Sequence, residues 1–151
     1  MATSPVISCE FFPPKTDKGI RNLLQVQTDL VALNPAFYSV TFGAGGSTQD
    51  NTLDAVVAIQ QRATETGIDA APHLSCVGSS SERIRTILQT YIDNDISRLV
   101  ALRGDLPSGM RDPGDFRYAN ELVEFIRDET GDHFTIEVAA YPEVHPQAQD
   151  A

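Results

Sequence analysis

Five polar side chains recur at nearly even intervals along this chain. Glu10, Thr41, His73, Asp105 and Tyr141 are separated by 31, 32, 32 and 36 residues. Together they offer two carboxylates, a hydroxyl, an imidazole and a phenol, which are groups that proteins use in general acid–base chemistry. Their spacing predicts one polar group for each structural unit of similar length, all delivered to a common edge.

The clearest of these units ends in two charged residues. The aliphatic run 99–102 breaks into Arg103, Gly104 and Asp105. Such a run is typical of a buried parallel strand, and parallel α/β folds place their chemistry at the carboxyl ends of their strands. Strict alternation puts Arg103 and Asp105 on the same face as Leu99. Either charge alone would suit a surface turn, so the functional interpretation depends on similar strand ends elsewhere.

Predicted strands and helices alternate along the whole chain. Helical periodicity begins near Thr16 or Asp17, and a capping box of Ser79 and Glu82 is expected to open a later helix. The alternation predicts right-handed βαβ units and a parallel sheet. No Gly-x-Gly-x-x-Gly follows the first strand, which favours a (β/α)8 TIM barrel over a dinucleotide-binding fold. The predicted strands are 7–12, 37–42, 70–76, 99–102 and 135–142, and the predicted helices are about 16–33, 49–66, 80–93 and 118–130.

The length fits only part of such a barrel. An eight-stranded barrel usually takes about 250 residues, whereas this chain has 151 residues and five predicted strands. We therefore expect residues 1–151 to be the amino-terminal portion of a single barrel domain, with about the first five β/α units. A self-contained open sheet is the alternative, although its unpaired edge would invite association.

Composition excludes some partners. Eleven basic and 21 acidic side chains give a formal net charge of −10, which argues against nucleic acid and anionic membranes as partners. The chain lacks an apolar stretch of about 20 residues and an export signal at its start, so we expect a cytoplasmic protein. Cys9 and Cys76 lie in predicted strands without a CxxC pair, which predicts buried, reduced thiols.

Five blocks of the sequence, in this order, resemble the methylenetetrahydrofolate reductase family. The resemblance extends from about Ile7 to the end, and it implies a closed eight-stranded barrel that binds FAD. It also implies reduction of 5,10-methylenetetrahydrofolate to 5-methyltetrahydrofolate with NADH or NADPH, in a homo-oligomeric complete protein. The blocks are Glu10–Lys15, Ser39–Ala44, Ala71–Leu74, Ala101–Pro107 and Ala140–Pro146.

The resemblance also implies roles for particular residues. Glu10 and Asp105 would face the folate as the catalytic residues, Glu10 as a proton donor partly shielded by Phe11, Phe12 and the flavin, and Asp105 as an ionised group beside Arg103. No metal site is implied. Phe42 stands where many relatives have tyrosine. The implied FAD contacts are Thr41, Phe42, Ala44, His73, Arg103, Gly104, Asp105, Tyr118, Ala119, Tyr141 and His145.

Two other interpretations stay open. A metal-dependent TIM-barrel hydrolase would use Glu10, His73, Asp105 and His145 as ligands; the lack of a His-x-His or His-x-x-x-His pair and the charge of Arg103 argue against it. The chain could instead be an inactive fragment that needs a complementing chain. We expect these 151 residues alone not to retain stoichiometric FAD.

Overall fold

The computed structural model describes residues 5–42, 46–105 and 114–140, with only the backbone described for 46–50. Five parallel strands form one sheet in the order β1-β2-β3-β4-β5. This order follows the sequence without a reversal, unlike a doubly wound sheet. The strands are β1 (Cys9–Phe11), β2 (Phe37–Val40), β3 (Asp69–Ser75), β4 (Arg98–Leu102) and β5 (Thr135–Val138).

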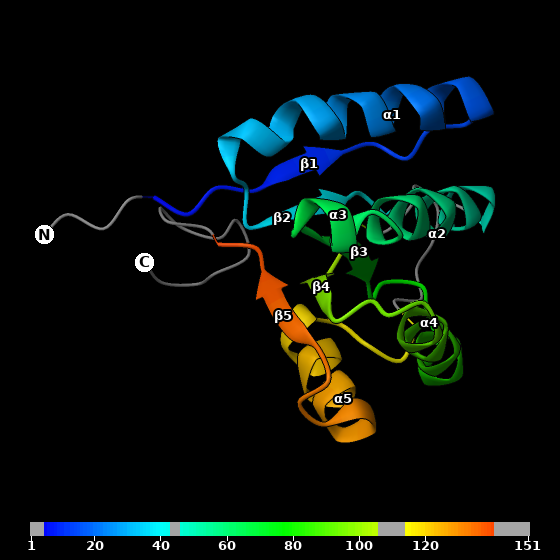
Figure 1. Ribbon diagram of the computed structural model, residues 1–151. Helices are drawn as coiled ribbons and strands as arrows, with labels where there is room; N and C mark the ends of the chain where they lie inside the picture. Colours follow the sequence, from blue (N-terminus) through cyan, green and yellow to red (C-terminus); the bar gives the residue numbers. More distant parts are fainter. Residues whose placement is uncertain (1–4, 43–45, 106–113, 141–151) are drawn as a thin grey trace, which may run out of the picture.

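The helices lie along the outer side of this sheet, from α1 at the top of Figure 1 to α5 at the bottom. This arrangement confirms an α/β fold with a parallel sheet, while closure into an eight-stranded barrel stays a prediction. The helices are α1 (Asp17–Leu30), α2 (Gly46–Gln60), α3 (Ala63–Thr66), α4 (Ser81–Asp93) and α5 (Ala119–Thr130), and a short 3-10 helix, η1 (Val31–Leu33), extends α1.

One face of the sheet packs against these helices, and we call it the helix-covered face. Its residues in the three central strands are fully buried, among them Val40, Leu74 and Leu99, whereas those in β1 and β5 are partly buried or exposed. They form one hydrophobic cluster with side chains of α1, α2, α4 and α5, such as Leu88 and Leu122. Burial of this apolar surface is the main force that fixes the helices on the sheet.

The opposite face of the sheet carries polar side chains. Glu10 of β1 pairs in register with Ser39 of β2, and His73 of β3 pairs with Val100 of β4, which in turn pairs with Glu137 of β5. Residues in register on neighbouring strands point to the same side. The polar groups at the carboxyl ends of β1 and β3 therefore share a face.

Local capping signals agree with the sequence analysis except at one helix. The Thr16 hydroxyl accepts from Gly19 N and starts α1 as expected. The predicted box of Ser79 and Glu82 is wrong by one residue, because Ser80 is the cap and accepts from Arg83 N. Ser79 is instead buried against a distant loop.

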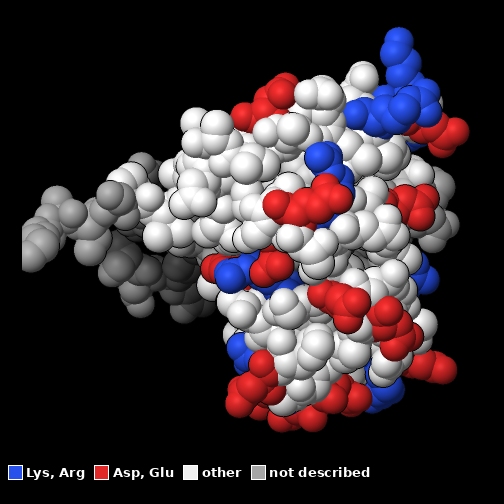
Figure 2. Space-filling model, viewed as in Figure 1, with Lys and Arg blue, Asp and Glu red and all other residues white. Residues whose placement is uncertain are grey.

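Surface charge on the face seen in Figure 2 is mixed, and carboxylates gather over its lower part, where α4 and α5 lie. No helix in the described part of the chain is long and apolar enough to cross a bilayer. Cys9 and Cys76 are free thiols, as predicted, and Cys76 is fully buried while Cys9 is only partly so.

Candidate functional site

Two side chains predicted from separate strands meet on the opposite face. His73 Nε2 lies 3.3 Å from Glu10 Oε2. Glu10 is the middle residue of β1 and His73 follows Pro72 in β3, so the contact passes across β2. The sheet thus brings together an acid and an imidazole that are 63 residues apart in the sequence.

The two members of this pair differ in exposure. The His73 side chain is 12% exposed and the Glu10 side chain 53% exposed. Burial lowers the pKa of His73 below its ordinary value, and the nearby Glu10 carboxylate opposes this shift only in part. The imidazole is therefore neutral at neutral pH. Depending on which nitrogen carries the proton, its Nε2 can either donate a hydrogen bond to Glu10 or accept one from it.

The expected shield around Glu10 is not formed by its neighbours in the sequence. Phe11 points to the helix-covered face, where its ring lies 5.6 Å from that of Tyr38. Phe12 is 80% exposed. The expectation that these two rings shield Glu10 is therefore wrong for Phe11, because successive strand residues point to opposite faces.

Thr41 and Phe42 directly follow β2. Thr41 N donates to Phe11 O at 3.0 Å, and Thr41 O accepts from the Thr52 hydroxyl at 3.0 Å, which ties this turn to α2. The Phe42 side chain, half-buried, lines a groove of about 500 Å³ that is bordered by Leu53 of α2 and several residues of α4. These contacts fix the strand end on both sides.

The carboxyl end of β4 is held against the end of β3. Arg103 O accepts from the Ser75 hydroxyl and from Val77 N, each at 3.0 Å. Gly104 has φ +78°, and a Cβ there would lie 1.9 Å from Ser75 Oγ. Only glycine fits this turn without strain.

This turn also changes the faces predicted by strict alternation. Leu99, which we expected to share a face with Arg103 and Asp105, is on the helix-covered face, opposite to Glu10. β4 ends at Leu102. Because Gly104 then adopts a left-handed conformation, the period of two does not extend to Asp105.

The segment 114–118 approaches the same edge from the amino end of α5. Arg103 Nε donates to Arg117 O at 3.1 Å. The Glu121 carboxylate accepts from Arg117 N at 2.5 Å and Tyr118 N at 3.2 Å, which caps α5. Tyr118 is 52% exposed and Ala119 begins the helix.

The predicted site therefore forms two groups among the described residues. Glu10 and His73 are in contact, and Arg103, which precedes Gly104, is hydrogen-bonded to the segment that leads to Tyr118. No hydrogen bond or ion pair within the described ranges joins Asp105, which is exposed, to Glu10 or His73. Ala44, Tyr141 and His145 lie outside the described residues.

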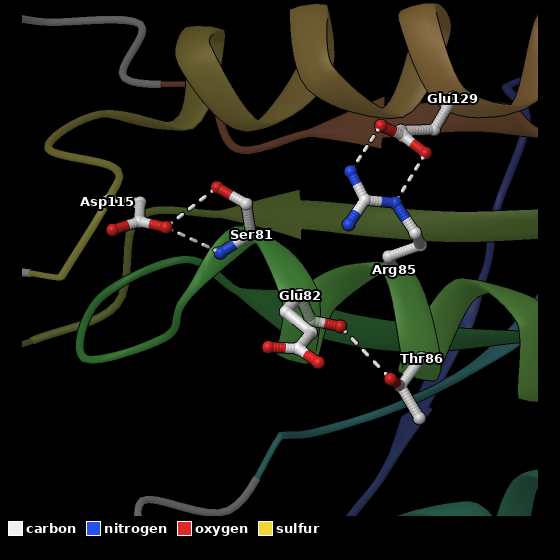
Figure 3. A network of polar contacts seen from close by, with 6 residues as sticks. All are labelled: Ser81, Glu82, Arg85, Thr86, Asp115 and Glu129. Atoms are coloured by element: carbon white, nitrogen blue, oxygen red, sulfur yellow. Dashed lines mark hydrogen bonds and ion pairs between the residues drawn. The ribbon is translucent and has the colours of Figure 1, made fainter.

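Two residues of this edge were missed by sequence reasoning. Ser75 supports Arg103 and limits residue 104 to glycine. Asp115 binds the first residue of α4, as Figure 3 shows. Both act on partners about 30 residues away, so no local sequence pattern could have identified them.

The described residues give no support to the hydrolase interpretation. They contain no group of three or more His, Cys, Asp or Glu side chains arranged to hold a metal ion. Of the three candidate ligands that the structure describes, Glu10 and His73 are in contact and Asp105 is not joined to either by a hydrogen bond or ion pair. His145 lies outside the described part of the chain.

Comparisons of the sequence with known proteins find relatives from a single enzyme family. A family model described as "Methylenetetrahydrofolate reductase" matches residues 1–151. The chain is 44% identical over 145 residues to the 5,10-methylenetetrahydrofolate reductase of Escherichia coli, covering 96% of this chain and 47% of that protein. It is 41% identical to "Methylenetetrahydrofolate reductase (NADH) 1" of Zea mays, covering 93% of this chain and 24% of that protein. A solved structure of Streptococcus suis SuiB aligns over 91% of this chain and 42% of its own with a TM-score of 0.44 and 13% identity, too distant a likeness to bear on function.

Proposed function

Because this chain belongs to the methylenetetrahydrofolate reductase family, we propose that it forms the amino-terminal part of a flavin-dependent enzyme that reduces 5,10-methylenetetrahydrofolate to 5-methyltetrahydrofolate with NADH or NADPH. The chain spans about half the length of its bacterial relatives. The observation that carries the proposal is the contact between Glu10 and His73 at the carboxyl edge of the sheet.

The groups at this edge suit FAD. Arg103 offers a cation for a diphosphate and is anchored through Nε, while Gly104 keeps the backbone free of a side chain beside it. The imidazole of His73 is neutral and can hydrogen-bond to uncharged polar atoms of the cofactor. Bound FAD would supply two-electron transfer between the nicotinamide and the folate.

Glu10 is the proposed proton donor to the folate. Opening the five-membered ring of the substrate requires a proton at the departing nitrogen, and a carboxylic acid at the substrate face can deliver it. His73 Nε2, 3.3 Å away, holds the Glu10 carboxyl group in position. Because the imidazole is neutral, it can share one proton with Glu10 and does not lock the acid in an ion pair.

Asp105 is proposed to remain ionised and to stabilise the positive charge that develops on the opened folate. It is exposed and lies two residues after Arg103. With Glu10 as the proton donor and Asp105 as the partner of the developing positive charge, the two acids would divide the work.

We also propose that the sheet closes into an eight-stranded barrel in the complete protein. The unreversed strand order and the helices on one face are what the first five units of such a barrel require. The barrel would cover the opposite face with further strands and complete the cofactor site. For the complete protein, a cytoplasmic homo-oligomer is part of this proposal.

A two-step experiment on the full-length protein tests this function. The purified protein should contain FAD, and its visible absorbance should bleach when NADH or NADPH is added without oxygen. Subsequent addition of methylenetetrahydrofolate should restore the colour and yield methyltetrahydrofolate. A colourless protein with bound zinc or manganese would instead favour the hydrolase, and uptake of FAD only after addition of a separate chain would favour the complementing fragment.

A further inference from the structure

A carboxylate from outside the helix holds the amino terminus of α4. Asp115 Oδ2 accepts from Ser81 N and from the Ser81 hydroxyl, both at 2.7 Å (Figure 3). The backbone continues the contact, because Asp115 N donates to Ser79 O at 3.2 Å. Segment 114–118 is therefore bound to the turn between β3 and α4.

The two backbones approach too closely for a side chain at the neighbouring position. Gly114 has φ +80° and forms a parallel bridge with Ser79. A Cβ on Gly114 would lie 2.5 Å from Ser79 O. The hydrogen bonds from Ser81 lower the pKa of Asp115, so its carboxylate is charged at neutral pH and binds both donors strongly.

The same segment leads to the residues expected to contact the flavin. Two residues after Asp115, Arg117 O accepts from Arg103 Nε at 3.1 Å. Tyr118 follows Arg117. Phe116, between Asp115 and Arg117, is buried, and its ring lies 5.2 Å from that of Phe125 in α5. A shift at Asp115 would therefore move the acceptor that orients Arg103.

We propose that Asp115 is a positioning residue for the cofactor edge: by binding segment 114–118 to α4, it sets the orientation of Arg103 and the place of Tyr118. Asp115 acts through the backbone of this segment. The inference rests on the proposed function, since it concerns how tightly the edge binds FAD.

The test is flavin affinity in the full-length protein, measured by fluorescence as the apoprotein is titrated with FAD. Asp115→Asn retains the size of the side chain but removes its charge, and we expect the Kd for FAD to rise at least tenfold. Ser81→Ala should raise it by a smaller factor, because Ser81 N–H remains as a donor. Amide hydrogen exchange at 114–118 without FAD should be faster in Asp115→Asn.

Glu129→Gln is the matched control. Arg85 of α4 binds Glu129 of α5 through two hydrogen bonds of 2.7 Å (Figure 3). This contact joins α4 to α5 itself and does not involve segment 114–118. We expect its loss to leave the Kd for FAD within twofold of the wild type and the exchange of 114–118 unchanged.

Three results would overturn the inference. An unchanged Kd in Asp115→Asn, with or without a lower Tm, would show a purely structural role. An equal rise in the Kd for FAD in Asp115→Asn and in Glu129→Gln would assign the effect to general packing of α4 against α5. A wild-type protein that binds no FAD would remove the proposed function itself, which distinguishes that failure from an inference that fails alone.

Discussion

The two faces of the sheet are built from alternate residues of the same strands and differ in almost every physical property. On the helix-covered face, Val40, Leu74 and Leu99 are fully buried and apolar. On the opposite face, Glu10 is half-exposed and His73 nearly buried, and they contact each other. Stability depends mainly on the first face and the proposed chemistry on the second, so a shift of one residue in a strand would exchange the two.

The opposite face is polar at both ends of its strands. Near the amino ends, the Arg98 guanidinium lies 5.0 Å from the centre of the Phe37 ring and binds the Glu137 carboxylate. Near the carboxyl ends lie Glu10 and His73. A face with one polar pair near each end of its strands is unlike a protein core. The proposed further strands would have to leave room for the Arg98–Glu137 pair and for the Glu10–His73 pair.

The largest effect is expected from Glu10→Gln in the full-length protein. The amide cannot donate an acidic proton, so folate reduction should fall by two or more orders of magnitude, which is at least about 2.7 kcal/mol of barrier. Reduction of the flavin by the nicotinamide should continue at nearly the wild-type rate. Stopped-flow measurement of the two half-reactions checks this, and an equal loss in both would make Glu10 a structural or cofactor-binding residue.

A pair of valine variants compares the faces directly. Val40→Ala removes two buried methyl groups from the helix-covered face and should lower the free energy of unfolding by about 2 kcal/mol. Val100 is half-buried on the opposite face. If further strands cover that face, Val100→Ala in the full-length protein should cost a similar amount. A cost below about 0.5 kcal/mol in urea unfolding would contradict barrel closure.

Two glycine variants separate conformational strain from close packing. Gly104 and Gly67 both have positive φ. A Cβ added at Gly104 would lie 1.9 Å from Ser75 Oγ, whereas a Cβ added at Gly67 would have no neighbouring atom within 4 Å. Gly104→Ala should therefore destabilise the protein by about 1 kcal/mol more than Gly67→Ala. Thermal unfolding of both variants measures the difference, and equal losses would mean that Ser75 moves aside without cost.

The smallest effect concerns the titration of His73. Its pKa is lowered in the folded protein from an ordinary value of 6.5, mainly by burial. The unfolded chain therefore binds more protons below that pH, and the free energy of unfolding should fall as the pH decreases through 6.5 towards the folded pKa. Above pH 6.5 His73 is neutral in both states, and its contribution to the free energy of unfolding is fully present.

Glu10→Gln sharpens this last prediction. The carboxylate of Glu10 raises the pKa of His73 and opposes the effect of burial. Its removal should lower the pKa of His73 further, as followed by NMR titration of the imidazole. An unchanged titration would show that the two side chains do not interact in solution.

Sequence periodicity was sufficient for the order of strands and helices, since each unit has its own apolar pattern. It failed where a distant contact decides the local structure. Ser79 resembles a helix cap, but its bridge to Gly114 leaves that role to Ser80. The alternation predicted from Leu99 to Asp105 fails for a similar reason, because the turn at Gly104 depends on Ser75 from another strand.

The candidate site was predicted in part. The contact between Glu10 and His73 follows from the regular spacing of units in a parallel sheet, so both residues could be named in advance. Asp115 could not, because its partner Ser81 is 34 residues away and nothing in the sequence near either residue indicates the other.

The sequential strand order has a consequence for how the protein is made. Each strand pairs with the one synthesised just before it, at a separation of about 30 residues, so every new unit finds its docking edge already present on the ribosome. Once the third strand has emerged, the acid and the imidazole can meet. The contact between Glu10 and His73 would then form early in translation, before segment 114–118, which binds Arg103, has left the exit tunnel.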